Sequence, residues 1–205
     1  MKRLVDALFA TFLLVLFCIP MLLVAIAVKL TSQGPVIHWS RRIGKNNREF
    51  LMPKFRTMRV DAPQLATHQL FDADRWITPI GAWLRRTSVD ELPQLYSVLK
   101  GDMSIVGPRP ALFNQFDLVA ERTARGIHRL TPGVTGWAQI RGRDRLSIAE
   151  KVAMDEYYLH RQSLALDLHI VLVTVIKSFR GDDVAAAGPG ISPAHDAVVD
   201  QNVAA

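Results

Sequence analysis

The sequence contains a single cysteine, Cys18, and six histidines that show no metal-ligand spacing. One cysteine cannot form a disulfide within the chain, and a cysteine-rich zinc site is excluded as well. The signatures G-x-S-x-G, H-E-x-x-H and G-x-G-x-x-G do not occur. Gly44-Lys45 is not part of a P-loop, because Trp39 stands where the first glycine of that motif belongs. The common hydrolase, zinc-protease and nucleotide-binding motifs are therefore absent.

Acidic residues are the minority among the charges, with 19 Asp and Glu against 25 Lys and Arg, for a net charge of +6 over 205 residues. Residues 31–180 hold 22 of the basic and 14 of the acidic residues, whereas residues 181–205 hold four acidic residues and no basic one. A basic body expects an anionic partner, which could be nucleic acid, a lipid surface or a phosphorylated substrate. The 49% of hydrophobic residues excludes a wholly disordered chain.

Charge is missing altogether from Ala7 to Val28, a run of 22 residues. About 20 apolar residues suffice to cross a bilayer. Lys2 and Arg3 also resemble the start of a cleaved signal peptide, but the run exceeds the ~7–15 apolar residues usual in such signals. The run therefore favours a helix that stays with the protein.

Basic residues flank both ends of the run, and such residues prefer the cytoplasmic side of a membrane. Pro20 lies near the middle, where a proline kinks a helix. We expect a re-entrant helix that enters the membrane, bends at Pro20 and returns to the same face. A kinked spanning helix and a simple N-terminal anchor are the alternatives.

The remaining sequence predicts an α-rich α/β fold. A strand is expected over residues 36–39, and residues 101–110 are expected to form a loop. Ser88 to Glu91 has the S-x-x-E form of a capping box, which predicts the start of a helix that Gly101 ends. Further helices are expected over the ranges 79–86, 147–158 and 166–179. We expect three parts: a membrane-embedded helix over 1–30, a cytoplasmic-face catalytic body over 31–180, and a disordered tail over 181–205.

Two adjacent carboxylates, Asp90 and Glu91, stand at a predicted helix N-terminus. The structural interpretation is that acidic residues stabilise a first helical turn and that Glu91 closes the capping box. The functional interpretation is that a helix N-terminus with nearby Arg and Lys binds phosphate. A carboxylate placed there can attack phosphorus or hold Mg²⁺ against phosphate oxygens. The residues alone leave both interpretations open.

Four motifs in order resemble the bacterial sugar transferases, the monotopic polyprenyl-phosphate phosphoglycosyltransferases. They are KFRTM at 54–58, DELPQLYSVLKGDMSIVGPRP at 90–110, TPGVTGWAQIRGR at 131–143 and DEYY…LDL at 155–168. The resemblance covers about residues 1 to 180. It implies transfer of a sugar 1-phosphate from a UDP-sugar to undecaprenyl or another polyprenyl phosphate, with release of UMP. This step starts lipid-linked surface glycan assembly at the cytoplasmic face of the bacterial inner membrane.

The resemblance also implies roles for individual residues. Asp90 would attack the sugar-linked phosphate and carry a covalent phospho-sugar, and Glu91 would bind or orient Mg²⁺ together with Asp90. The residues expected to hold phosphates or order the site are Lys54, Arg85, Arg109, Arg143 and Asp167. Two positions depart from the family pattern: Ile19 replaces the usual Ser before Pro20, and Ser40 replaces a usual Gln.

Two competing functions use part of the same pattern. A non-catalytic, membrane-anchored basic module would bind nucleic acid or anionic lipid, but it gives the carboxylate pair no use. A membrane phosphohydrolase would pass the phosphate to water and need no lipid phosphate. The transferase interpretation expects a UDP-sugar, polyprenyl phosphate and membrane lipids as partners and no nucleic acid. The apolar segment over residues 1–30 and an amphipathic body over residues 31–180 are compatible with a homo-oligomer.

Overall fold

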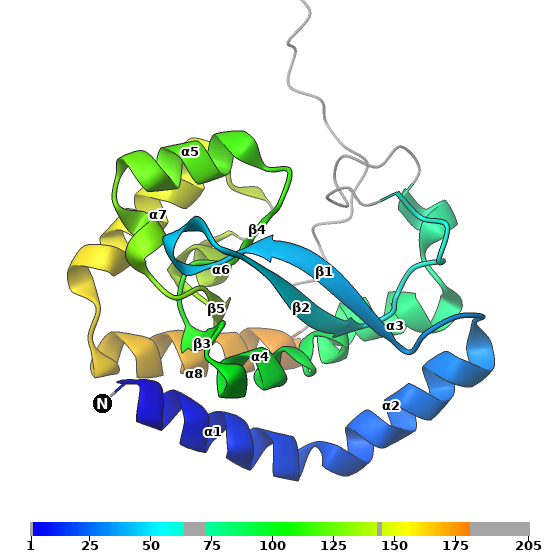
Figure 1. Cartoon of the computed structure of the whole chain (residues 1–205). Helices are drawn as coiled ribbons and strands as arrows, with labels where there is room; N and C mark the ends of the chain where they lie inside the picture. The colour runs from blue at the N-terminus through cyan, green and yellow to red at the C-terminus, as the bar shows by residue number, and fades with distance from the viewer. Residues whose placement is uncertain (1, 64–72, 143–144, 181–205) are drawn as a thin grey trace, which may run out of the picture.

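The fold is taken from a computed structural model of the chain, in which residues 2–63, 73–142 and 145–180 are described (Figure 1). The predicted tail at 181–205 lies outside the described residues. The fold is α/β and helix-rich, as expected from the sequence. The longer elements are α1 (Lys2–Leu16), α2 (Cys18–Thr31), β1 (Ile37–Ile43), β2 (Glu49–Phe55), α3 (Pro79–Thr87), α4 (Gln94–Lys100), α5 (Phe116–Ala124), α7 (Ile148–Arg161) and α8 (Leu164–Arg180). The shorter ones are η1 (Lys45–Asn47), η3 (Ala73–Trp76), η4 (Val89–Glu91), β3 (Ser104–Val106), β4 (Ala111–Leu112), η5 (Ile127–Arg129), β5 (Gly133–Thr135) and α6 (Trp137–Arg141).

The N-terminal apolar run forms two helices, α1 and α2, and the chain direction bends by 62° between them. Within the described residues no single helix has both the length and the hydropathy to cross a membrane, but this bent pair meets the requirement when taken together. The break falls at Phe17, and the ladder is intact on both sides, from Phe17 N to Leu13 O at 2.9 Å and from Met21 N to Phe17 O at 2.8 Å. Pro20 has no N–H for the carbonyl of Leu16, which explains a bend one turn before the proline.

Both halves of the bent pair pack against the body and leave an apolar face exposed. Ala10 of α1 is fully buried in the main core, with residues of β2, α4, β3, α6, α7 and α8. Val24 and Val28 of α2 join a second core with Phe55 and Leu84. Figure 1 shows α1 and α2 running along one side of the body, with α4 and α8 nearby. The exposed face carries Leu4, Leu8, Phe12, Val15, Ile19, Leu22, Leu23 and Ile26.

The strands form two small sheets. β1 pairs with β2 in an antiparallel hairpin and with β4 on its other side, giving the order β2-β1-β4. The register places His38 opposite Lys54 and Ser40 opposite Met52. β3 and β5 pair in parallel, with Ser104 beside Gly133. The loop expected over 101–110 is therefore partly wrong, since β3 lies within it.

Several predicted helices are present with small shifts at their ends. The helix predicted over 79–86 is α3, whose first turn is capped by Thr78 through a hydrogen bond from Gly81 N at 3.0 Å. The helix predicted from Ser147 is α7, and the one predicted over 166–179 is α8. Gly101 ends α4 in a left-handed conformation with φ 99°, which glycine adopts without a steric penalty.

The capping box predicted at Ser88 is wrong. Ser88 adopts a left-handed conformation with φ 54° and ends α3 instead of starting the next helix. A 3₁₀ turn, η4, follows it and carries Asp90 and Glu91, and α4 begins only at Gln94. The Glu91 side chain binds two cationic side chains rather than the backbone of Ser88. The carboxylate pair therefore sits in a tight connection between two helices.

Candidate active site

Glu91 lies at the centre of a cluster of charged side chains drawn from distant parts of the chain. Its Oε1 accepts hydrogen bonds from Lys54 Nζ at 2.8 Å and from Arg109 Nη2 at 2.7 Å. Arg109 Nη1 lies 3.4 Å from Oε2, a longer contact than either of the two hydrogen bonds to Oε1. Burial raises the pKa of Glu91, but Arg109 and Lys54 outweigh burial and hold that pKa well below its usual range. Glu91 is therefore ionised at neutral pH.

Lys54 comes from β2, and Arg109 comes from the loop between β3 and β4. The antiparallel register of β1 and β2 fixes the backbone of Lys54 opposite His38. Burial lowers the pKa of Lys54, and the adjacent Glu91 opposes that effect. The side chain of Lys54 is only 14% exposed, so this ion pair is screened little by solvent.

Asp90, the neighbour of Glu91, is 7% exposed. Burial and the charge of Glu91 raise the pKa of Asp90 to about 6, against the opposing influence of Lys54, Arg85 and Arg109. A carboxylate with a raised pKa is more basic, and hence more nucleophilic, than an ordinary aspartate, yet Asp90 remains mostly ionised at pH 7. This arrangement suits a carboxylate that must attack an electrophile.

Arg85 extends from the last turn of α3 beside this pair. Its Nε donates a hydrogen bond to Thr57 Oγ1 at 2.9 Å. Burial lowers the pKa of Arg85, and Asp90 opposes the shift. Among the described residues, Lys54, Arg85 and Arg109 thus stand against the two carboxylates, a balance that favours an additional anion such as a phosphate.

One predicted site residue, Asp167, lies away from this cluster. Asp167 is buried at the start of α8, where it accepts hydrogen bonds from Tyr158 Oη at 2.7 Å and from Lys2 Nζ at 2.6 Å. It therefore joins α8 to α7 and to the N-terminal helix. Arg143 lies outside the described residues.

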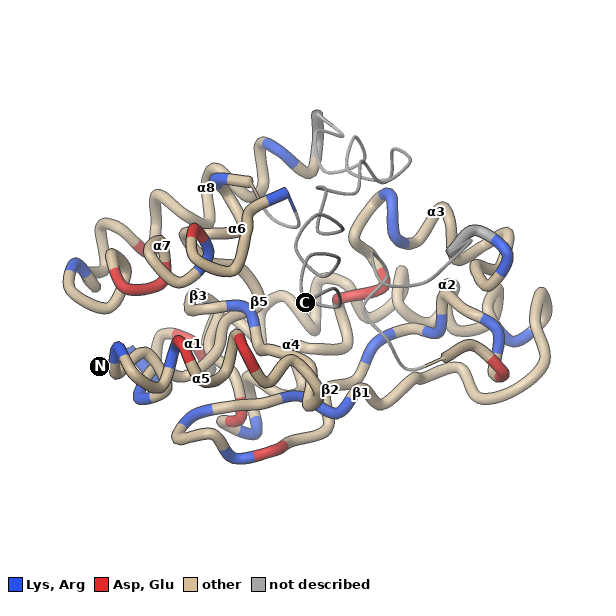
Figure 2. The backbone as a smooth tube through the Cα atoms, turned by 90° about the horizontal axis from the view of Figure 1, so that it is seen from above, with Lys and Arg blue, Asp and Glu red and all other residues tan. Residues whose placement is uncertain are grey.

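The same junction holds α1 through a buried carboxylate that sequence reasoning did not single out. Asp6 accepts hydrogen bonds from Ser104 Oγ at 2.8 Å and from Ile105 N at 3.2 Å. Arg3 donates to the carbonyl oxygens of Val98 and Leu99 at the end of α4. The first turn of α1 is thus fastened to the body. Figure 2 shows several basic and acidic positions close together near the N-terminus.

Arg56 is a second residue whose role the sequence did not reveal. It is 5% exposed, and its Nη2 donates to the backbone carbonyl of Ser32 at 2.8 Å and to Ser32 Oγ at 2.6 Å. Nη1 donates to the carbonyl of Gln33. Arg56 therefore fixes the chain that leaves α2 to the end of β2. In the sequence, only its position two residues after Lys54 could have indicated that Arg56 helps to organise the region around the site.

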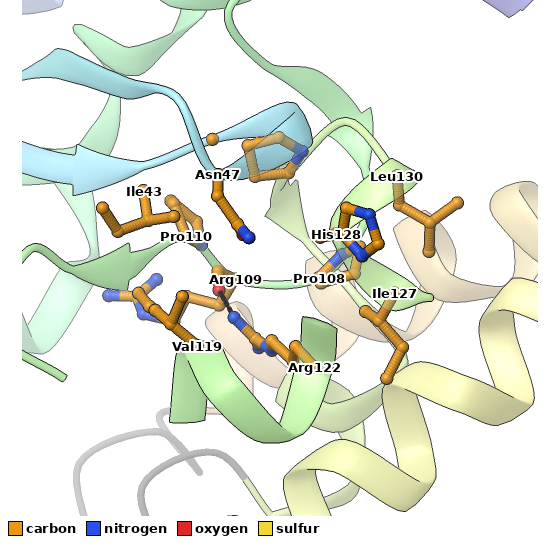
Figure 3. Close-up of a pocket in the computed structure, with 13 residues that line it drawn as sticks. Ile43, Asn47, Pro108, Arg109, Pro110, Val119, Arg122, Ile127, His128 and Leu130 are labelled. Carbon is orange, nitrogen blue, oxygen red and sulfur yellow. Dashed lines mark hydrogen bonds between the residues drawn. The ribbon is translucent and has the colours of Figure 1, made fainter. Parts of the chain in front are cut away.

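A cavity of about 30 Å³ lies beneath the backbone of Arg109 (Figure 3). Residues of β1, η1, α5 and η5 line it, among them Asn47, Arg122 and His128. This volume suits a water molecule and is far smaller than the several hundred Å³ of a typical ligand pocket. The cavity is therefore too small to hold a nucleotide sugar.

Comparison with known proteins finds relatives that are named as undecaprenyl-phosphate sugar transferases. Undecaprenyl-phosphate glucose phosphotransferase of Komagataeibacter xylinus is 43% identical, over 85% of this chain and 35% of its own length. UDP-glucose:undecaprenyl-phosphate glucose-1-phosphate transferase of Escherichia coli (strain K12) is 41% identical, over 87% of this chain and 40% of its own. The chain thus spans less than half of these two relatives.

A shorter relative is matched over most of its length. Exopolysaccharide production protein ExoY of Rhizobium meliloti (strain 1021) is 38% identical, over 85% of this chain and 83% of its own. Residues 1–181 of the chain match the family model for bacterial sugar transferases. The match takes in the bent helical pair, the carboxylate pair and the basic residues around it, and the chain belongs to the bacterial sugar transferase family.

Proposed function

We propose that this protein is a phosphoglycosyltransferase that moves a sugar 1-phosphate from a UDP-sugar to undecaprenyl phosphate. The observation that carries the proposal is the buried carboxylate of Asp90, whose pKa is raised to about 6 by burial and Glu91, among Lys54, Arg85 and Arg109. Family membership and the names of the relatives supply the substrate class. Such a transfer starts the assembly of a glycan on its lipid carrier.

The proposed reaction has two displacement steps at one phosphorus. A carboxylate oxygen of Asp90 attacks the sugar-linked phosphorus of the donor, the bond from that phosphorus to the bridging oxygen breaks, and UMP leaves with the bonding electrons. A phosphate oxygen of the polyprenyl phosphate then attacks the same phosphorus and displaces Asp90. The products are UMP and a polyprenyl diphosphate sugar. Lys54, Arg85 and Arg109 reduce the repulsion between the anionic substrates and the carboxylate.

We include Mg²⁺ in the proposal. Within residues 2–63, 73–142 and 145–180 there is no group of three or more His, Cys, Asp or Glu side chains suited to a metal. Mg²⁺ commonly binds one or two carboxylates and completes its shell with water and substrate phosphates, which fits the two adjacent carboxylates here. Asp90 and the less engaged Oε2 of Glu91 would hold the ion. When bound, it would neutralise charge on the donor diphosphate.

The proposal places the protein at the cytoplasmic face of the bacterial inner membrane, with the bent pair re-entering that face. Lys2 at the start of α1 binds Asp167 of the body, and the residues that follow α2 bind Arg56 of the body. Both ends of the bent pair are therefore attached to the same body, as a re-entrant helix requires. Ile19 in place of the usual Ser leaves the bend itself to Pro20.

Intact mass spectrometry tests the covalent step. The purified protein is incubated with Mg²⁺ and UDP-glucose, or with UDP-N-acetylgalactosamine, without lipid acceptor. We expect an added mass equal to the sugar phosphate, its discharge when undecaprenyl phosphate is added, and no adduct with Asp90→Asn. Unchanged turnover in Asp90→Asn would refute the proposed nucleophile. Release of free sugar phosphate into water at the rate of UMP release would favour a phosphohydrolase.

A further inference from the structure

The loop that carries Arg109 is held by its carbonyl oxygens. Pro108 and Pro110, on either side of Arg109, have no N–H to donate. Gly133 N donates to the Pro108 carbonyl at 2.9 Å, and Arg42 Nη1 donates to the Pro110 carbonyl at 3.1 Å. Between them, the carbonyl of Arg109 itself accepts from Arg122 Nη1 at 2.8 Å. The position of the Arg109 backbone therefore depends on the side chain of Arg122.

Arg122 is itself held by a buried carboxylate. Its Nε and Nη2 lie 3.0 Å and 2.6 Å from Oδ2 of Asp155 on α7. The side chains of Arg122 and Asp155 are 12% and 2% exposed, so the pair is shielded from water. Figure 3 shows Arg122 reaching from α5 to the Arg109 carbonyl beside the small cavity. Two edges of one guanidinium are thus used, one toward Asp155 and one toward the loop.

We propose that Arg122 and Asp155 are positioning residues for the transfer reaction. Asp155 orients Arg122, Arg122 fixes the backbone of Arg109, and the Arg109 guanidinium then meets Glu91 and the donor diphosphate in a constant geometry. This inference rests on the proposed function of the Asp90 and Glu91 site. Neither residue reaches the carboxylate pair, so their effect on the reaction passes through Arg109.

The rigid fork of Arg122 is needed because one planar group must serve two acceptors. A lysine at this position would keep the charge next to Asp155 but would offer a single ammonium in place of the fork. Loss of either partner alone would leave a buried charge without compensation and would destabilise the fold. A change of both partners to apolar residues of similar size avoids that problem, since such exchanges are often close to neutral for stability.

A neighbouring ion pair provides a matched control. Arg125, the residue directly after α5, places its Nη1 2.9 Å from Glu156 Oε2 of α7, and the two side chains are 44% and 33% exposed. Within the described part of the chain, Arg125 makes no hydrogen bond to the loop at 107–110. Replacement of this pair by Arg125→Met and Glu156→Leu therefore removes a charge pair between the C-terminal end of α5 and α7 without changing any contact of the Arg109 backbone.

The test compares the double variant Arg122→Met with Asp155→Leu, the control double variant and Arg122→Lys, all as full chains. Steady-state rates are measured with UDP-glucose, or whichever UDP-sugar the wild type uses, and with undecaprenyl phosphate. We expect kcat/KM for the donor to fall about tenfold or more in the Arg122 and Asp155 variant, because a small misplacement of a positioning group has effects of this size. Its melting temperature should stay within a few degrees of the wild type. Arg122→Lys should also lose donor kcat/KM, and the control should keep it.

A structural role would give a different result. Loss of folded protein lowers the apparent kcat/KM for donor and acceptor in the same proportion, whereas misplacement of Arg109 lowers the donor value more. The inference would be overturned if the folded double variant kept the wild-type donor kcat/KM. It would also be overturned if Arg122→Lys kept that value. A wild-type protein that forms no adduct with any UDP-sugar would instead refute the proposed function.

Discussion

Arg109 and Glu91 meet side by side, with Nη2 of Arg109 2.7 Å from Oε1 of Glu91 although 18 residues separate them in the chain. The same oxygen also accepts from Lys54, so one carboxylate joins β2, the turn before α4 and the loop after β3. This contact sets the geometry around Asp90. It also makes the stability of the fold depend on a residue of the site.

Glu91→Gln is expected to destabilise the protein by about 1–3 kcal/mol, because it leaves Lys54 and Arg109 without their shared carboxylate. Chemical denaturation would measure the change. Glu49→Gln is the control: it breaks an ion pair with Arg41 in which both side chains are 50% exposed. Exposed pairs contribute about 0–1 kcal/mol, so an equal effect of the two substitutions would contradict the central role of Glu91.

Asp90→Asn is expected to stabilise the metal-free protein above pH 6 while it abolishes adduct formation. The pKa of Asp90 is raised by burial and by Glu91 from 3.8 to about 6, so between these values the folded chain keeps a proton that the unfolded chain has lost. Stability from this group is therefore full below pH 3.8 and declines as the pH rises to about 6. At pH 8 this decline in the free energy of unfolding amounts to about 3 kcal/mol. The neutral amide introduced by Asp90→Asn does not titrate and so avoids the decline. Melting curves of both proteins at pH 4 and pH 8 test this, and a gain at pH 8 no larger than at pH 4 would contradict it.

The donor reaction should depend on pH through the same carboxylate. Because burial and Glu91 raise the pKa of Asp90 to about 6, kcat/KM for the UDP-sugar should rise with pH and level off above that value. Glu91 stays ionised over this range, since Arg109 and Lys54 overcome burial and keep its pKa well below the usual value. Initial rates of UMP release from pH 5 to pH 8 provide the measurement. Rates that stay level over this whole range would contradict an Asp90 nucleophile with a raised pKa.

Pro20→Ala should restore the missing backbone hydrogen bond to Leu16 and straighten the bent pair. A continuous helix from residue 2 to residue 31 would be about 45 Å long, enough to cross a bilayer. The measurement uses a Cys18→Ser protein with one cysteine added before Met1 and a thiol reagent that does not cross the membrane. With Pro20 present, this reagent should not label the cysteine from outside intact cells. With Pro20→Ala, labelling from outside should appear. Pro35→Ala, placed after α2, is the control and should leave the labelling unchanged.

The two S-x-x-E patterns of this chain show where sequence reasoning succeeds and where it fails. Ser147 and Glu150 form a true capping box: Glu150 N donates to Ser147 Oγ at 3.3 Å, and Ser147 N donates to Glu150 Oε2 at 2.8 Å. Both residues are exposed, so local bonding decides their conformation. Ser88 and Glu91 have the same spacing, but Lys54 and Arg109 bind the Glu91 carboxylate more strongly than a backbone N–H would. The short-range pattern could not show these distant partners.

The same distinction applies to the rest of the molecule. Periodicity and caps locate α3, α7 and α8, because those signals lie within each segment. The three-residue strands β3 and β5 were missed, since their pairing joins segments about 30 residues apart and leaves no local pattern. Asp167 was placed correctly at a helix start, but its partners Tyr158 and Lys2 could be known only from the fold. Family motifs identified Asp90 and Glu91, whereas the supporting roles of Arg56, Arg122 and Asp155 follow from the structure alone.

The short spacing between Lys54 and Arg56 has a consequence for where the acceptor lipid must present its phosphate. Lys54 reaches Glu91, and Arg56 reaches the carbonyls that follow α2. Their Cα atoms are two residues apart, about 7 Å in an extended chain. In the proposed membrane orientation, this short spacing and the two side-chain contacts hold the reacting carboxylate at a depth set by the fold, not by the lipid. The lipid phosphate must come to that fixed level, so bilayers that hold it deeper or shallower should slow the second displacement and leave the first unaffected.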